Sequence, residues 1–172
     1  EAADALSQSL HAAAAPRPGS SAPDPGAAFV LAARDQLLAR LDIETDAAVK
    51  GALAATIGRL PYRDPAAIAA AEEAILSTLG PAGALERPAL PSVLGAARGA
   101  ESLLRLHARA ATPSAGLIER LNALLATRPG QAWDPTSVES AAAVRRLALA
   151  ALTAANRADA AALESAAADP DN

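Results

Sequence analysis

The chain has no cysteine and no methionine, and only three of its 172 residues are aromatic: Phe29, Tyr62 and Trp133. Without cysteine there can be no disulfide framework and no thiolate metal site, so neither redox compartment is excluded. With so few rings, a deep globular centre would lack its usual large side chains. No run of 18 apolar residues occurs, so the sequence predicts no membrane span.

Strand-forming residues are also scarce. The β-branched and aromatic residues are scattered and never alternate with polar ones over a run. Alanine, in contrast, makes up nearly a third of the chain, and leucine is the commonest large residue. Both have high helix propensity and suit closely packed helices. We therefore predict an all-α fold.

The charge pattern is mild. The formal net charge is −4, and arginine supplies all but one of the 15 basic side chains. Residues 1–94 carry 7 basic and 11 acidic side chains, whereas residues 95–157 carry 8 and 4. This basic excess is small and has no aromatic residues among it, so we expect no nucleic-acid partner. The abundance of Arg, Ala and Pro is typical of a GC-rich bacterial genome.

Helix breakers recur along the chain. Asp64-Pro65, Thr112-Pro113, Asp134-Pro135 and Asp169-Pro170 separate segments of helical periodicity, and two such segments fill about 45 residues. A period of this length indicates a helical solenoid, a class of protein that mostly binds partners along its surface. The closing Asp-Pro turn predicts that the stack continues in a longer parent chain.

The expected elements follow from these breakers. Residues 1–15 read as a short helix with Leu6 and Leu10 one turn apart, and residues 16–26 read as a Pro/Gly-rich linker. The helices expected after the linker cover 27–41, 47–60, 65–79, 92–111, 113–128, 135–156 and 158–168.

The segment 46–60 has two different apolar faces. Val49, Leu53, Ile57 and Leu60 form a large one, whereas Gly51, Ala54 and Gly58 lie on a face of very small residues. Glycine inside a helix is unfavourable, so we predict that these small residues mark a close helix–helix contact.

One charge falls within an apolar stripe. Arg34 lies among Val30, Leu37, Leu38 and Leu41, where an unpaired charge would be costly. We predict that it reaches a carboxylate, with Asp46 or Glu44 as the partner, or extends along the stripe to water.

Two segments resemble the second helix of HEAT repeats. ETDAAVKGALAATIGRL (44–60) and DPTSVESAAAVRRLALAAL (134–152) each have an acidic turn, then Val and a basic residue, then small and leucine-like positions. The resemblance covers roughly residues 27–172 and implies a HEAT-like α-solenoid repeat domain used as a binding scaffold. In bacterial proteins similar to this one, such repeats are sometimes joined to a catalytic domain, for instance a peptidyl-prolyl isomerase.

No catalytic, cofactor or metal motif is present. The two histidines, His11 and His107, have no carboxylate or second histidine at ligand spacing, and we expect both at the surface. The carboxylates of Glu72 and Glu73 are adjacent and do not share a helix face. Trp133 is expected to pack a loop onto the helices.

Two basic clusters remain as candidate partner sites. Arg98, Arg105 and Arg109 form a row on one helix face, and Glu101 precedes Arg105 by four residues in the favourable orientation for an ion pair. A solvated helix face is the simpler interpretation of this row. The pair Arg145-Arg146 is expected to bond to a turn carboxylate of its own repeat.

Two functions follow from these observations. The first is a non-enzymatic scaffold that binds a protein or peptide, with the row of Arg98, Arg105 and Arg109 as the candidate surface. The second is an accessory repeat segment of a larger enzyme whose catalytic domain lies outside residues 1–172. The sequence leaves open the partner, the oligomeric state and the compartment, whether cytoplasmic, periplasmic or secreted.

Overall fold

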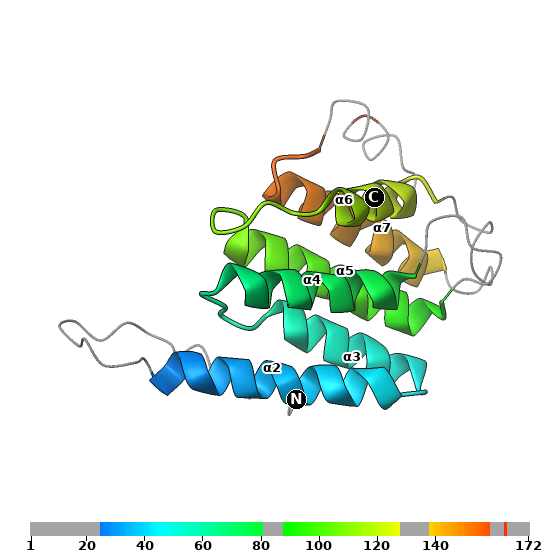
Figure 1. The fold of residues 1–172 in the computed structure, drawn as a ribbon. Helices are drawn as coiled ribbons and strands as arrows, with labels where there is room; N and C mark the ends of the chain where they lie inside the picture. Colours follow the sequence, from blue (N-terminus) through cyan, green and yellow to red (C-terminus); the bar gives the residue numbers. More distant parts are fainter. Residues whose placement is uncertain (1–24, 81–87, 128–137, 159–163, 165–172) are drawn as a thin grey trace.

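The computed structural model describes residues 25–80, 88–127, 138–158 and 164 (Figure 1). All secondary structure in these residues is helical, which confirms the all-α prediction. Six helices lie in these ranges: α2 (Pro25–Ile43), α3 (Ala47–Gly58), α4 (Pro65–Leu79), α5 (Leu90–His107), α6 (Ala115–Leu125) and α7 (Val138–Ala154). The expected helix 1–15, nearly all of the expected helix 158–168, and His11 and Trp133 lie outside the described residues.

Several helix ends follow from the breaker residues. The Asp46 side chain caps α3 by accepting from the N–H groups of Ala48 and Val49. The Asp64 side chain caps α4 by accepting from the Ala66 N–H, and Pro65 is the first residue of that helix. Gly80 ends α4 with a φ of 69°, which a residue with a side chain rarely adopts.

Several boundaries differ from the predictions, three of them as follows. Helix α2 begins at Pro25, so the last two residues of the expected linker belong to it. Helix α5 ends at His107 rather than at residue 111, because the N–H groups of Ala110 and Ala111 both bond to the His107 carbonyl and turn the chain. The cap of α6 is Ser114, whose hydroxyl accepts from Leu117 N–H, rather than the preceding Thr-Pro pair.

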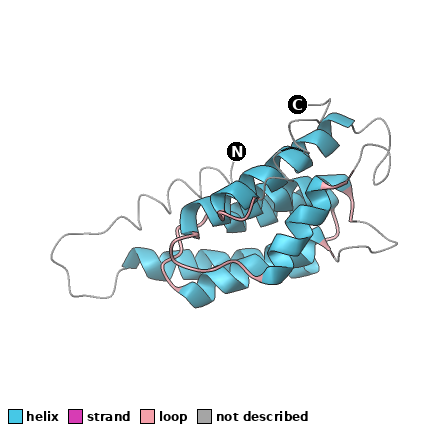
Figure 2. Ribbon diagram, turned by 90° about the horizontal axis from the view of Figure 1, so that it is seen from above, coloured by secondary structure: helices cyan, strands magenta, loops and turns pink. Residues whose placement is uncertain are grey.

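The helices form two layers. Most chain neighbours contact one another, but α5 and α6 do so little or not at all. The most extensive contacts are α3 with α5 and α5 with α7, which are next-but-one helices. Contacts between α2 and α4 and between α4 and α6 are sparse. Figure 1 shows the three pairs stacked from α2 and α3 to α6 and α7, and the view from above shows the helices in two rows (Figure 2). We call α3, α5 and α7 the tight layer and α2, α4 and α6 the open layer.

The core lies between the two layers. Its largest fully buried side chains come from both of them, and several sit near the ends of their helices. They are Ile57, Leu60, Ile75, Leu79, Leu103, Leu117, Leu121, Leu124 and Leu152, with Val30, Val93 and Val144.

The tight layer is held by small residues, as predicted from the face of Gly51, Ala54 and Gly58. A Cβ added to Gly58 would lie 2.6 Å from the Cα of Gly99, well inside van der Waals contact. A Cβ on Gly99 would lie 3.0 Å from the carbonyl carbon of Ala54, and one on Gly51 would meet the backbone of Pro91. The backbones of α3 and α5 therefore touch, and only residues with little or no side chain fit between them.

Candidate functional site

The predicted arginine row lies on and just beyond α5. Arg98 and Arg105 are exposed on the helix, and Arg109 is exposed in the turn after it, so the row continues past the helix end. The predicted pair of Glu101 and Arg105 is confirmed, with Arg105 Nε 2.7 Å from Glu101 Oε1. The Arg105 side chain is 57% exposed, so this pair contributes little to stability and leaves the guanidinium accessible.

The position of α5 makes this row central. Helix α5 contacts α3 on one side, α7 on the other, and α4 behind it. Both neighbouring helices carry exposed alanines, at Ala48 and Ala52 in α3 and at Ala150 in α7.

The two layers also differ in charge. The three helices of the tight layer carry five basic and two acidic side chains, a formal charge of +3. The three helices of the open layer carry three basic and five acidic side chains, a formal charge of −2. An anionic partner would therefore be favoured on the tight layer.

The open layer contains grooves that the sequence did not reveal. A groove of about 750 Å³ runs between α2 and α4, where Asp42, Lys50 and Glu73 lie among hydroxyl and apolar side chains. A second groove, of about 560 Å³, lies between α4 and α6 and is lined by Glu73, Glu119 and Arg120 among others. These grooves exist because α2 and α4, and likewise α4 and α6, contact each other only sparsely. The helices of each pair are about 40 residues apart, so no local sequence pattern predicts the space between them.

Polar side chains join next-but-one helices within each layer. In α5, His107 Nε2 donates to the Leu60 carbonyl at 2.9 Å, just after the end of α3. In α6, Arg120 Nη2 donates to the carbonyl of Leu79, the last residue of α4, at 2.6 Å. In both cases a later helix satisfies a carbonyl at the end of an earlier one, which the earlier helix cannot bond itself.

Two polar residues are buried, and one of them, His107, was expected at the surface. His107 is only 7% exposed, and its ring lies 5.6 Å from that of Tyr62. Glu72 is 8% exposed, and its Oε1 accepts from the Ser114 N–H at 2.9 Å. The sequence could not reveal either bond, because each partner is more than 40 residues away. Arg145 is also buried, and its predicted carboxylate partner stays a prediction.

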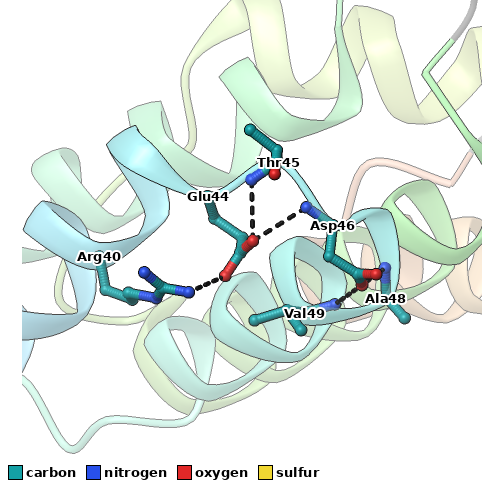
Figure 3. Close-up of polar contacts among 6 residues, drawn as sticks. All are labelled: Arg40, Glu44, Thr45, Asp46, Ala48 and Val49. Atoms are coloured by element: carbon teal, nitrogen blue, oxygen red, sulfur yellow. Dashed lines mark hydrogen bonds and ion pairs between the residues drawn. The ribbon is translucent and has the colours of Figure 1, made fainter.

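The turn between α2 and α3 is built around one carboxylate (Figure 3). Glu44 Oε1 accepts from the N–H groups of Thr45 and Asp46, at 2.8 and 2.9 Å. Its other oxygen accepts from Arg40 Nη2 at 2.5 Å. The N–H of Asp46, then that of Thr45, and the charge of Arg40 hold the pKa of Glu44 below its ordinary value, against the opposing effect of burial.

The partner predicted for Arg34 is wrong. Arg34 does bond to a carboxylate, but this is its neighbour Asp35, at 2.6 Å, while Glu44 bonds to Arg40 and Asp46 caps α3. Arg34 lies ten residues before Glu44, which is about 15 Å along a helix, whereas Arg40 is one turn away.

The search for relatives gives no family. No protein-family model matches the chain, and no curated protein or solved structure matches it significantly. Among the described residues, no group of three or more histidine, cysteine or acidic side chains could hold a metal ion. None of the described helices is both long and apolar enough to cross a membrane. The surfaces themselves are thus the basis for a functional proposal.

Proposed function

We propose that this chain is a HEAT-like α-solenoid segment with a non-enzymatic role, and that its tight layer binds an acidic segment of a protein partner. The pattern of helix contacts supports the solenoid interpretation. Every described pair of helices in extensive contact consists of chain neighbours or of next-but-one helices. It is supported further by the polar bonds of His107 and Arg120, which repeat the same relation in successive helix pairs.

The observation that carries the binding proposal is the exposed arginine row at the centre of the basic layer. Arg98, Arg105 and Arg109 are all exposed, so the carboxylates of a partner can reach their guanidinium groups. Guanidinium groups bond carboxylates in a bidentate geometry, which gives orientation as well as attraction.

Binding to a labelled oligo-glutamate peptide tests this proposal. The variant R98Q/R105Q/R109Q is compared with R40Q/R63Q/R157Q, which removes the same charge at exposed arginines of other elements. We expect the first variant to weaken binding about tenfold and to reduce its dependence on salt, and we expect the second to change it far less.

An oligonucleotide of similar charge serves as the competing ligand. If it binds the row as tightly as the acidic peptide does, the row is a general anion-binding surface and the protein-partner proposal fails. Equal binding of both variants to the peptide would show instead that the row is only a solvated helix face.

A further inference from the structure

A cavity beside α4 combines an apolar wall with two carboxylates. It has a volume of about 370 Å³ and lies where α4 meets the turn that leads into α6. Ile68, Leu76 and Ala111 contribute to the apolar wall. Glu72 and Glu73 both line the cavity although they are adjacent in sequence, and among its described lining residues they are the charged ones. The cavity therefore has a negative charge beside an apolar surface.

Glu72 is the buried carboxylate of this cavity, at 8% exposed. Its Oε1 accepts from the Ser114 N–H, and no basic side chain in the described part of the chain forms an ion pair with it. A carboxylate has about four acceptor positions, of which this bond uses one. The N-terminus of α6 supplies only about half an elementary charge. Because a buried charge is costly unless it is paired, a cation in the cavity would complete the environment of Glu72.

Glu73 adds a second charge to the same cavity. It is exposed and has no hydrogen bond or ion pair within the described ranges. The basic side chains nearby in the fold leave this charge in place. Arg120 lines the adjoining groove and donates to the Leu79 carbonyl, while Arg109 is exposed two residues before Ala111 and does not line the cavity.

A long basic side chain has the chemistry that this cavity requires. Lysine and arginine each combine an aliphatic stem with a cationic end group. The stem would lie against Ile68, Leu76 and Ala111, and the end group would meet Glu72 and Glu73. A divalent metal ion fits less well, because it takes six or more oxygen ligands and no described group of three acidic, histidine or cysteine side chains could hold one.

The cavity continues into the groove between α4 and α6. The two share Glu73 and Leu76, and together they follow α4 from Ile68 to Gly80. This part of the helix is about 18 Å long, which matches about five residues of an extended chain. Exposed Glu119 also lines the groove and favours a basic segment there. A side chain that belongs to a peptide can thus enter the cavity while its backbone lies in the groove, which a free amine would leave empty.

We propose that the cavity at Glu72 and Glu73 binds a lysine or arginine side chain of a partner protein, and that the residues flanking this side chain lie in the groove between α4 and α6. Glu72 pairs with the cationic end group inside the cavity, and exposed Glu73 pairs with it from the solvent side. The site belongs to the acidic open layer, so it is independent of the arginine row on the tight layer.

NMR titration with capped amino acids tests the cation site. The probes are N-acetyl-lysine amide and N-acetyl-arginine amide, and N-acetyl-norleucine amide is the control with a similar stem and no charge. We expect the two basic probes to shift the amide signal of Ser114 at millimolar concentrations and the norleucine probe to leave it unchanged. E72Q keeps an acceptor for the Ser114 N–H and should weaken binding about tenfold.

A second variant makes the result independent of any change in the core. E73Q alters only an exposed side chain and should also weaken binding of the lysine probe, whereas E139Q, at an exposed position of α7, should not. Equal shifts by the norleucine probe would show a merely apolar cavity and would overturn the proposal. Binding unchanged in both E72Q and E73Q would overturn it as well, and so would tighter binding of Mg²⁺ or Ca²⁺ at the same signals.

A capped pentapeptide with a central lysine and neutral flanking residues tests the source of the side chain. We expect it to bind several-fold more tightly than the capped lysine. S77W, which fills the groove but not the cavity, should abolish this gain, whereas N122W, on exposed α6 surface outside the groove, should preserve it. If a free diamine such as 1,4-diaminobutane binds as tightly as the pentapeptide, the assignment to a protein side chain is wrong.

Discussion

The contacts of α3 with α5 and of α4 with α6 join helices in equivalent positions, yet they are built in opposite ways. Between α3 and α5, glycine and alanine let the two backbones touch. Between α4 and α6, the helices stay apart, and Arg120 and Glu72 reach across to backbone groups while a groove remains open. Stacking thus depends on residues with little or no side chain between α3 and α5, and on long polar side chains between α4 and α6.

This difference explains what the sequence could predict. The small-residue face of α3 is a local pattern, so the close contact of Gly51, Ala54 and Gly58 was predictable from spacing alone. The caps at Asp46 and Asp64 were predictable for the same reason, because a cap bonds N–H groups two or three residues away.

The largest effect is expected at the contact of α3 with α5. G58L should lower the free energy of unfolding by about 3 kcal/mol, the upper part of the range for overpacking, because the added atoms meet the Gly99 backbone and cannot be accommodated by a rotamer change. The denaturant midpoint measures this. A52L, on an exposed position of the same helix, is the control, and equal midpoints for the two variants would contradict a close contact.

A smaller substitution at the same position should have the opposite effect on stability from the one that is usual in helices. Gly to Ala in a helix normally stabilises by up to about 1 kcal/mol. G58A should destabilise, because even one methyl meets backbone atoms, whereas G116A in α6 should be neutral or slightly stabilising, because its added methyl lies 3.3 Å from the flexible end of Leu76. If both variants stabilise the protein, the two contacts are not built differently.

The next effect concerns the buried carboxylate of the open layer. E72A leaves the Ser114 N–H without its acceptor and should cost about 1–3 kcal/mol in denaturant unfolding. E72Q keeps a carbonyl oxygen at this position and should cost less. E73A, on the exposed neighbour, should stay within about 0.5 kcal/mol of the unchanged protein, and a similar loss for E72A and E73A would refute a role for the bond to Ser114.

A smaller loss is expected at Arg120. R120M keeps the length of the side chain but removes both hydrogen bonds to the Leu79 carbonyl, so it should lower stability by about 1 kcal/mol. R120K restores one charged donor and should recover part of the loss, as measured by chemical unfolding. Full stability in R120M would mean that the open layer does not depend on this bond.

The smallest effect is a pH dependence at the turn between α2 and α3. Because the pKa of Glu44 is lower in the folded chain than in the unfolded one, its stabilisation is complete near neutral pH and is lost as the pH falls below about 5. E44Q should therefore lose less Tm than the unchanged protein between pH 6 and pH 3, as scanning calorimetry would show. E73Q controls for removing an exposed carboxylate, and identical acid slopes for all three proteins would contradict this role of Glu44.

The missed contacts of His107 and Glu72 share one physical cause. His107 was expected at the surface, and nothing in the sequence around Glu72 marks it as buried, but each bonds a backbone group more than 40 residues away. The error at Arg34 is of another kind, because its partner is the adjacent Asp35 and not a carboxylate of the following turn. Periodicity predicts which face of a helix is apolar, whereas it carries no information about which distant carbonyl or N–H that face will meet.

The arginine row was predictable as a pattern, and only its extent needed correction. Arg98 and Arg105 follow helical spacing and are exposed on α5. Arg109 fits the same spacing but lies beyond the helix end, because the chain turns after His107. The central position of the row in the tight layer could not be predicted, since it depends on how α3 and α7 lie against α5.

The glycines between α3 and α5 give this protein an unusual mutational profile. In an ordinary core, harm comes mainly from truncation, since losing a methylene leaves a void. At Gly51, Gly58, Gly95 and Gly99 no truncation is possible, and every missense change of a glycine codon adds atoms beside a neighbouring backbone. Substitutions at these four glycines therefore do harm by enlarging the side chain, while at the buried leucines of α6 they do harm by shrinking it.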